Sequence, residues 1–558
     1  MPVQTAFAPY RLPPGALPEE ASRRATASAA EPLVVRLDEP LPGSMVGQAL
    51  ADVAAGHAAG SEEGCRAADG TPSGLPGPLR ACLVSDRHRA SVESAIASAL
   101  AAGFAGVCLD RPDAPIAQGF LGSGFCPDCQ RFFSKELARE YGDHFMPLDY
   151  LALAREALAQ ASGAVTFAQL PFGRDFWRMR VASLDRAVGA YARAARDASR
   201  KGGKPFEVTA QFEAIGPAQL RAARHLDAAI FPVKGEAQTT GAGRFRLLRA
   251  VMGRRPCAAA LIDGPALPLA QRLAGVAAAS GVELIGLPTG DAAELAALRR
   301  FARLVTAQRH APGVAEAVFE CAILYSHEAD LGTGGDHRVQ VERAGDALAA
   351  LQIQAPVVTR LDDAPPHSVL VLAGAAKLGP LEAAELKRRV EAGAGALVLG
   401  ELGAVDSSGR EAPAPLPVGK PAGVRVANGT VATIPPLPAP RPGAVLEPAQ
   451  LDALARPVAM LLGRGRRAAS VAGRTPVLAA LYRNEERLDA HLVTLGAGVA
   501  QGATLFLGLH VAGTARRARF QSAGGGDERI TMNPSGYSIS TVLPAFKGYA
   551  VLSVGAGV

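Results

Sequence analysis

The chain has 558 residues, of which 49% are hydrophobic and 20% charged, a composition typical of a globular protein that buries a large core. Its net charge of +6 is scattered along the sequence, and a nucleic-acid partner is not expected because no dense basic patch is present. No apolar run approaches the ~20 residues of a membrane span. The opening residues "MPVQTAFAPY" lack the basic start and apolar core of a signal peptide, so we expect a cytoplasmic protein.

Residues 1–312 alternate short apolar runs with helical patterns, which predicts a series of βα units. Eight such units are typical of a (β/α)8 TIM barrel, a fold of about 250 residues before insertions. Residues 40–78 fit no element clearly. The expected strands are the runs 3–8, 32–39, 79–86, 106–110, 206–213, 227–234, 257–263 and 282–288.

Two smaller domains are predicted after the barrel. Residues 313–440 place strands at 316–326, 367–374 and 396–403 and helices between them, which indicates a parallel sheet covered by helices on both faces. A proline-rich stretch, 435–445, reads as a linker. Residues 441–558 alternate short strands with turns and predict a small β-sandwich.

Acidic residues end three of the expected barrel strands, where barrel enzymes place their active sites. Glycoside hydrolysis needs two carboxyl groups, one to protonate the leaving oxygen and one to attack the sugar or activate water. We therefore interpret Asp110 as the nucleophile, Glu213 as the acid/base and Asp263 as an orienting residue. The alternative is that these acids cap helices or lie in solvated loops. Residues expected to bind substrate near the same strand ends are Asp113, Gln211 and Lys234.

The pair Cys126 and Cys129 has the spacing of two zinc ligands, at the start of a predicted helix. Seven cysteines in a long chain argue against a disulfide framework. Structural zinc typically takes four ligands, so two more residues are needed, and core packing of the pair is the alternative. Candidates for the missing ligands are Cys82, Cys108, His144 and Asp128.

Several strings resemble family 42 β-galactosidases and related glycosyl hydrolases. "HSVLVLAGAAKLGPLEAAELKRRVEAGAGALVLGELG" is similar to their trimerisation-type domain, whose sheet is like that of class I glutamine amidotransferases. "GFCPDCQRFFSKELAREYG" resembles the segment after their fourth barrel strand, and "TVLPAFKGYAVLSV" their closing β-domain. The resemblance covers most of residues 80–555. It implies a carbohydrate or glycoside substrate and a homo-oligomer, either a dimer or a trimer.

The sequence departs from the family pattern at the site. Where the family has Asn-Glu at the end of strand four, this chain has Leu109, Asp110 and Arg111, and the strand-seven acid is an aspartate. The turn at 373–376, Ala-Gly-Ala-Ala, lacks an amidotransferase nucleophile, so that domain is expected to be structural. His327, Asp336 and His337 are expected at the surface or in loops.

Three functional hypotheses follow. The first is a glycoside hydrolase with a two-carboxylate mechanism, which requires no cofactor. A structural zinc ion at Cys126 and Cys129 is a separate hypothesis. The second is a catalytically inactive scaffold or carbohydrate-binding protein that retains the fold. The third is another reaction on a sugar-like natural product. A shared fold does not by itself separate them.

Overall fold

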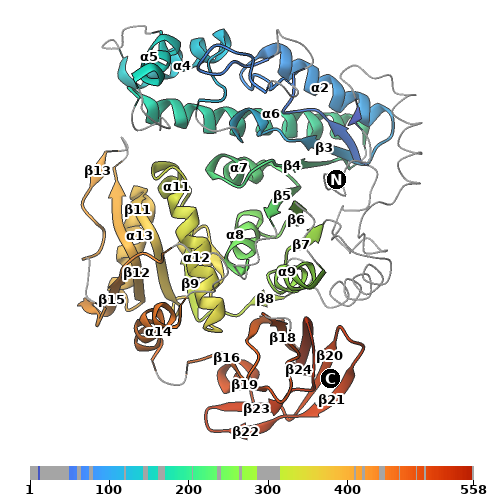
Figure 1. Cartoon of the computed structure of the whole chain (residues 1–558), viewed down its shortest axis with the longest axis vertical. Helices are drawn as coiled ribbons and strands as arrows, with labels where there is room; N and C mark the ends of the chain where they lie inside the picture. The colour runs from blue at the N-terminus through green and yellow to red at the C-terminus, as the bar shows by residue number, and fades with distance from the viewer. Residues whose placement is uncertain are drawn as a thin grey trace. The chain divides into compact units, whose positions relative to one another are not determined.

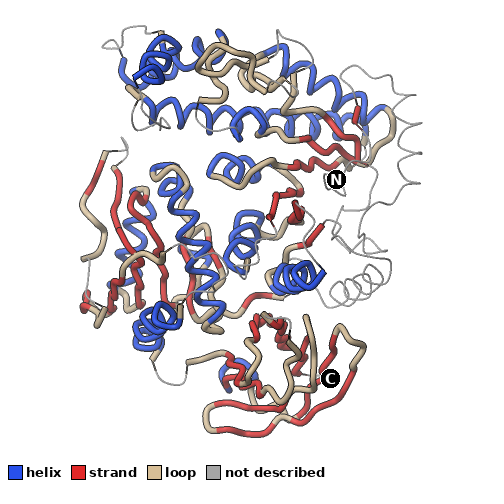
Figure 2. The backbone as a smooth tube through the Cα atoms, in the orientation of Figure 1, coloured by secondary structure: helices blue, strands red, loops and turns tan. Residues whose placement is uncertain are grey.

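A computed structural model describes residues 11–12, 50–58, 64–74, 79–117, 121–142, 149–160, 170–203, 205–234, 241–262, 267–285, 315–406, 410–417, 421–438, 447–463, 466–484, 487–495 and 498–555. The described residues up to Pro232 belong to an N-terminal unit, and those from Val233 onward belong to a C-terminal unit. Both units mix helices and strands (Figures 1 and 2). No helix among these ranges is long and apolar enough to cross a membrane.

The N-terminal unit is built on parallel strands that pair in chain order, β1 with β2, β2 with β3, β3 with β4 and β4 with β5. Parallel neighbours require crossover connections, as expected of successive βα units. Closure into an eight-stranded barrel stays a prediction. The strands are β1 (Arg11–Leu12), β2 (Leu50–Val53), β3 (Gly106–Asp110), β4 (Glu207–Gln211) and β5 (Ala228–Lys234).

Helices α2 and α6 pack side by side in this unit (Figure 1). Ser85 caps α2 by accepting a hydrogen bond from the His88 backbone N–H, and α6 runs for 30 residues. The helices of the unit are α2 (Asp86–Ala101), α3 (Ala114–Ala117), α4 (Pro127–Tyr141), α5 (Tyr150–Gln160), α6 (Gly173–Gly202) and α7 (Pro217–Ala222), with a 3-10 turn at Ala223–His225.

The predicted strand at 79–86 was wrong. Arg80 and Ala81 form only isolated bridges, to His57 and Gly64, and α2 already begins at Asp86. Within this run, Cys82 is buried in a cluster of cysteines and Val84 packs against that cluster. The second sheet strand comes from the unassigned region 40–78, as β2. The strands predicted at 3–8 and 32–39 lie outside the described residues.

The C-terminal unit begins with α8 (Ala242–Met252), β6 (Cys257–Ile262), α9 (Leu267–Ala279) and β7 (Glu283–Ile285), and β6 and β7 pair in parallel. It continues in a sheet with the order β10-β9-β11-β12-β15-β14. The five strands from β10 to β15 in that order are parallel, as predicted for residues 313–440. Their bounds are β9 (Cys321–Leu324), β10 (Val357–Val358), β11 (Val369–Leu378), β12 (Gly395–Val405), β13 (Glu411–Ala412), β14 (Val424–Val426) and β15 (Gly429–Ile434).

Helices pack on this sheet, and one of them also joins it to α8. Gly243 of α8 and Gly345 of α12 lie at a very close crossing, because a Cβ on Gly345 would meet the Gly243 Cα at 2.4 Å. Beyond the predicted linker, α14 packs against β12 and β15, so residues 448–462 belong to this sheet and not to the sandwich. The helices are α11 (His327–Gly332), α12 (Asp336–Ala350), α13 (Pro380–Glu391) and α14 (Pro448–Leu462), with a 3-10 turn at Leu361–Asp363.

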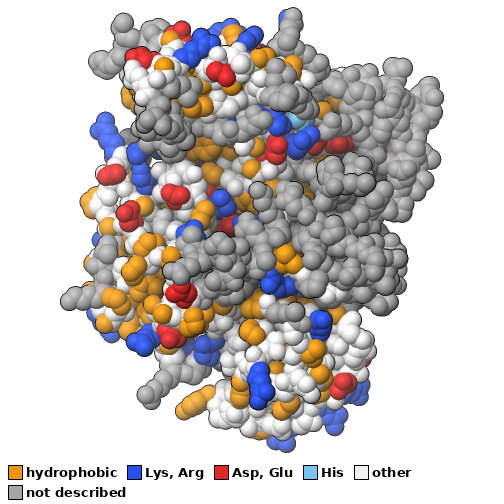
Figure 3. Space-filling view, in the orientation of Figure 1, with side chains coloured by type: hydrophobic (Ala, Val, Ile, Leu, Met, Phe, Trp, Pro, Cys, Tyr) orange, Lys and Arg blue, Asp and Glu red, His pale blue; other side chains and the backbone are white. Residues whose placement is uncertain are grey.

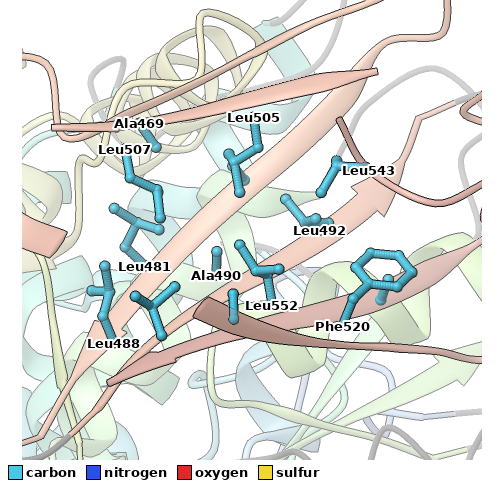
Figure 4. Close-up of a cluster of buried hydrophobic side chains, with 14 of the residues drawn as sticks. Ala469, Leu481, Leu488, Ala490, Leu492, Leu505, Leu507, Phe520, Leu543 and Leu552 are labelled. Atoms are coloured by element: carbon cyan, nitrogen blue, oxygen red, sulfur yellow. The ribbon is translucent and has the colours of Figure 1, made fainter. Parts of the chain in front are cut away.

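The last part of the chain forms two antiparallel sheets with the orders β16-β19-β23-β22 and β21-β20-β24-β18-β17-β8. Their facing side chains, including Leu481, Leu492, Leu505 and Phe520, make one buried core (Figure 4). The strands are β8 (Glu316–Ala317), β16 (Ala469–Ala472), β17 (Val477–Arg483), β18 (Arg487–Thr494), β19 (Thr504–Gly508), β20 (Arg517–Ser522), β21 (Asp527–Thr531), β22 (Asn533–Ser535), β23 (Ser538–Val542) and β24 (Tyr549–Gly555), with the short helix α15 (Leu509–Ala512).

The strand predicted at 316–326 is therefore two strands in different sheets. β8 pairs with β17 of the sandwich, whereas β9 lies inside the parallel sheet. Figure 3 shows basic and acidic side chains scattered over the described part of one face, in keeping with the dispersed charge of the sequence.

Candidate functional site

Asp110 lies at the carboxyl end of β3, where the chain turns tightly. Its carboxylate is largely buried and pairs with the neighbouring Arg111 guanidinium at 3.2 Å. Arg111 has a φ of +42°, in the left-handed region that strains a residue with a side chain. Gly56 packs directly against this turn, since a Cβ on Gly56 would lie 1.7 Å from the Arg111 carbonyl oxygen. Strained backbone of this kind is concentrated at functional sites.

Glu213 follows the carboxyl end of the next strand, β4. Its two oxygens accept from both terminal nitrogens of Arg80 at 3.2 and 3.4 Å. The Glu213 side chain is 31% exposed, whereas that of Arg80 is 10% exposed. Glu213 is therefore the carboxylate of this edge that a ligand in solvent can reach.

Asp113 is completely buried and holds the Glu213 segment in place. Its carboxylate accepts from the backbone N–H of Glu213 at 2.9 Å, from the N–H of Ala214 at 3.1 Å and from Gln219 Nε2 at 2.9 Å. Burial raises the pKa of Asp113 to about 6, against the opposing effect of these donors. With its oxygens used in this way, Asp113 orients Glu213 and does not face a ligand.

Replacing Asp113 with alanine should lower the free energy of unfolding by about 3 kcal/mol, because each buried N–H left without an acceptor costs about 1–3 kcal/mol. Urea unfolding monitored by circular dichroism measures this loss. Asp86→Ala is the matched control, since Asp86 is an exposed first-turn residue paired only with Arg89 in the described structure. Equal stability of the two variants would show that Asp113 does not support the segment.

The remaining predicted residues divide into those near this edge and those not described. Gln211 is the register partner of Asp110, so both side chains project from the same face of the sheet. Lys234 is the last residue of β5, and its side chain lies outside the described structure, as does the whole of Asp263. The structure thus brings together Asp110, Gln211, Asp113 and Glu213.

Sequence reasoning missed the two arginines at this edge. Arg80 was assigned to a strand, although an isolated arginine in an apolar run is a signal for a buried ion pair. Arg111 stands directly after Asp110 and was noted only as a departure from the family pattern. Asp110 and Glu213 thus each pair with a guanidinium group at this edge.

Further buried polar groups lie on the sheet face that carries Asp110 and Gln211, two residues earlier along β3 and β4. Asp52 and Cys108 are register partners, and Thr209 lies beside Cys108. Thr209 Oγ1 donates to Glu207 at 3.0 Å, and burial raises the pKa of Glu207 to about 7. Burial and the nearby carboxylates of Asp52 and Asp110 raise the pKa of the Cys108 thiol. Cys108 lies in β3, outside the cluster of cysteines described next.

A second constellation is formed by four buried cysteines of the N-terminal unit. The sulfurs of Cys126 and Cys82 are 3.3 Å apart, Cys82 and Cys129 3.6 Å, Cys65 and Cys126 3.7 Å, and Cys65 and Cys129 3.8 Å. Tetrahedral zinc with bonds of about 2.3 Å places its sulfurs about 3.8 Å apart. All four thiols are free, and these separations are far longer than a disulfide bond of about 2.05 Å.

The surroundings of Cys65 favour its thiolate form. The backbone N–H of Gly124 donates to the Cys65 sulfur at 3.0 Å. Hydrogen bonds from the other three thiols lower the pKa of Cys65, whereas the pKa values of Cys82 and Cys129 are raised. Several of the four cysteines are therefore disfavoured as thiolates at the same time unless a cation is bound. Of the other predicted ligands, Asp128 pairs with Arg131, and His144 lies outside the described residues. Cys65, which was not predicted, stands in a region where no element had been assigned.

The polar cluster of the second sheet is structural. His337 is fully buried, so its expected surface position was wrong. Its Nδ1–H donates to the Ala373 carbonyl at 2.8 Å, and its Nε2 accepts from the Ser326 N–H at 2.9 Å. Ser326 Oγ donates instead to Glu382 at 2.6 Å. Since both imidazole nitrogens are engaged with the backbone, this histidine is not a general base for the serine.

Burial lowers the pKa of His337 to about 4, below its ordinary value of about 6.5. The neutral imidazole is favoured in the folded state, so its stabilisation is complete above pH 6.5 and is lost as the pH falls toward 4. The loss reaches about 3 kcal/mol for a shift of this size. Buried Asp330 and Glu382 have raised pKa values and act in the opposite direction, so the comparison must be with a variant. In urea unfolding at pH 7 and 4.5, wild type should lose more stability than His337→Gln, and equal losses would contradict the assignment.

No protein-family model and no curated protein matches this sequence. Solved structures do share its fold. A β-galactosidase from Bacillus circulans superposes with a TM-score of 0.64 at 12% identity, over 91% of this chain and 89% of the other. The family 42 β-galactosidase Gan42B from G. stearothermophilus gives a TM-score of 0.61 at 12% identity, over 90% and 88%. An α-L-fucosidase from Paenibacillus thiaminolyticus gives 0.56 at 12%, over 91% and 87%. The chain therefore has the fold of family 42 β-galactosidases, and the expected resemblance is confirmed at the level of the fold.

Proposed function

We propose that the protein is a glycoside hydrolase in which Asp110 and Glu213 are the two catalytic carboxylates. The observation that carries the proposal is their position after neighbouring parallel strands, at the edge where enzymes of this architecture place their sites. The glycosidase fold raises the prior for this chemistry, and the buried Asp113 supports it by fixing the Glu213 backbone.

In this proposal the two carboxyl groups have different tasks. Asp110, largely buried beside Arg111, is the anion that attacks the anomeric carbon or stabilises its positive charge. Glu213, more exposed, delivers a proton to the leaving oxygen. For that step its carboxyl group exchanges its contacts with Arg80 for contact with the glycosidic oxygen, so Arg80 controls when Glu213 is a proton donor. Gln211, projecting on the side of Asp110, is placed to bind a sugar hydroxyl.

A second candidate, a catalytically inactive carbohydrate-binding protein, is favoured by one observation. Both carboxylates are already paired with arginines, and the Asp110 side chain is only 9% exposed. Such neutralised pairs can serve as fixed hydrogen-bond partners for sugar hydroxyls without any proton transfer.

Hydrolysis of a panel of 4-nitrophenyl glycosides tests the proposal, because nitrophenolate release is measured directly. The panel should include β-galactoside, α-fucoside and α-rhamnoside, since solved structures with this fold include enzymes named for these sugars. We expect turnover of at least one glycoside, which Asp110→Asn abolishes without unfolding the protein. Sugar binding by calorimetry with no turnover of any glycoside would support the binding protein instead.

We further propose that Cys65, Cys82, Cys126 and Cys129 hold a structural zinc ion. The donor set fits because Cys65, Cys126 and Cys129 place their sulfurs within 4.8 Å of one another and Cys82 lies 3.3 Å from Cys126. All four are buried, which leaves no open position for substrate. The ion would tie the loop at Cys65 and the start of α2 to the first turn of α4. We also propose that the chain forms a homo-oligomer, which light scattering after gel filtration measures.

A further inference from the structure

The C-terminal unit contains a large cleft that none of the described candidate active-site residues lines. It has a volume of about 1590 Å³ and is lined by the carboxyl ends of α8 and α9, the segment from β8 to β9 and the loops of the sandwich. This volume exceeds the roughly 300–1,000 Å³ of a typical small-molecule pocket. Residues of the described segments line it from several sides, so it is a feature of one compact unit.

Four basic side chains converge in this cleft from separate parts of the chain. His367 precedes β11, Arg466 precedes β16, Arg483 ends β17 and His510 lies in α15. They are close enough that, besides burial, the charges of Arg483, His367 and Arg466 lower the pKa of His510. Four elements that are distant in sequence thus bring basic groups together, and two arginine charges in one cleft repel each other when no counter-charge is present.

Within the described residues, no ion pair or side-chain hydrogen bond involves any of these four groups. Three acidic residues also line the cleft, Glu316, Glu320 and Asp363. Glu316 and Asp363 are exposed, and the carboxylate of Glu320 is engaged elsewhere. It is buried, pairs with Arg467 at 3.1 Å and accepts from the backbone N–H groups of Gln354 and Ala468. Glu320, the buried acid of the lining, is therefore neutralised by a different arginine and by the backbone.

Two further arginines, both in α8, line the cleft. Arg246 donates to the Ala355 carbonyl at 3.2 Å, and Arg249 donates to the Arg255 carbonyl at 3.2 Å. Both guanidinium groups are thus held by backbone carbonyl oxygens in the lining of the cleft. A concave surface lined in this way concentrates anions.

We propose that this cleft binds a small multivalent oxyanion, a ligand carrying two or more phosphate or sulfate groups, through Arg466, Arg483, His367 and His510. Arginine forks match the oxygens of phosphate and sulfate in paired hydrogen bonds. The size of the cleft leaves room for the molecule to which these groups are attached. The proposal is independent of the glycosidase assignment, because it involves neither Asp110 nor Glu213.

Isothermal titration of the full-length protein with inorganic pyrophosphate tests the proposal. We expect saturable binding at low salt that weakens steeply as sodium chloride is added, because charge–charge attraction is screened. Arg466→Ala and Arg483→Ala should each weaken binding by about tenfold, as expected for the loss of one charge-assisted contact. The matched control is Arg517→Ala, an exposed arginine of β20 in the same sandwich that does not line the cleft.

Each outcome of this titration bears on the proposal. Absence of saturable pyrophosphate binding at low salt overturns it, as does an equal effect of Arg517→Ala and Arg483→Ala. Equally tight binding of single inorganic phosphate contradicts the multivalent ligand. A parallel titration with a disulfated disaccharide separates the two sources, because the tighter of the two probes identifies phosphate or sulfate as the preferred group. The melting temperature of each variant confirms that it is folded.

Discussion

Asp110→Asn should lower the turnover number for the best glycoside about 10³-fold or more, with a smaller change in KM, because the lost interaction is made with charge that develops in the transition state. The asparagine side chain has nearly the volume of aspartate, and its amide oxygen can still accept a hydrogen bond from Arg111, so the variant should fold. Initial rates with nitrophenyl glycosides and a circular dichroism melt measure both quantities. In Asp110→Ala, added sodium azide should restore activity and give a glycosyl azide if Asp110 is the nucleophile.

The Glu213→Gln variant tests whether Glu213 is the general acid/base. An acid/base variant should lose much less activity with an activated nitrophenyl leaving group than with an unactivated glycoside, because the activated group needs little protonation. The basic limb of the pH–rate profile should also disappear. Arg80→Lys is the partner variant, since it keeps the charge but loses the paired contact to Glu213. If Asp110→Asn and Glu213→Gln both retain full activity, the active site lies elsewhere.

Cys129→Ser should release the zinc ion and lower the free energy of unfolding by about 4 kcal/mol, since binding energy at a structural site is also folding energy. Elemental analysis of wild type purified without added metal should give about one zinc per chain. Cys108→Ser is the matched control, because Cys108 is also a buried cysteine of the N-terminal unit but lies in β3, outside the cluster. Its zinc content should equal that of wild type.

Zinc below about 0.2 per chain in wild type would contradict the metal site, since structural sites bind tightly. Iron in its place would keep the cluster as a metal site but change the ion, because four thiolates also suit iron. Equal loss of stability in Cys129→Ser and Cys108→Ser without metal release would leave the four cysteines as core packing.

The sequence alone predicted those elements whose patterns are local. β3, β4, β5 and β6 appear within a few residues of the expected runs, because a short apolar run that ends in a polar residue is typical of a buried parallel strand. The parallel sheet around β11 and β12 and the antiparallel sandwich were predicted for the same reason. The run at 79–86 had the same pattern but forms only isolated bridges, and its Cys82 and Val84 pack in the cysteine cluster.

Residue types and strand ends determined the carboxylates, the cysteine pair and the likeness to a glycosidase fold. Only the tertiary structure decided the partners. Arg80 pairs with Glu213, 133 positions away in the sequence, and the buried Asp113 accepts a hydrogen bond from the Glu213 backbone. Cys65 and Cys82 lie beside Cys126 and Cys129. The tertiary structure also gathered four basic groups into one cleft. The physical reason is that strand and helix patterns depend on neighbours along the chain, whereas ion pairs and metal sites depend on contacts between segments that no local pattern encodes.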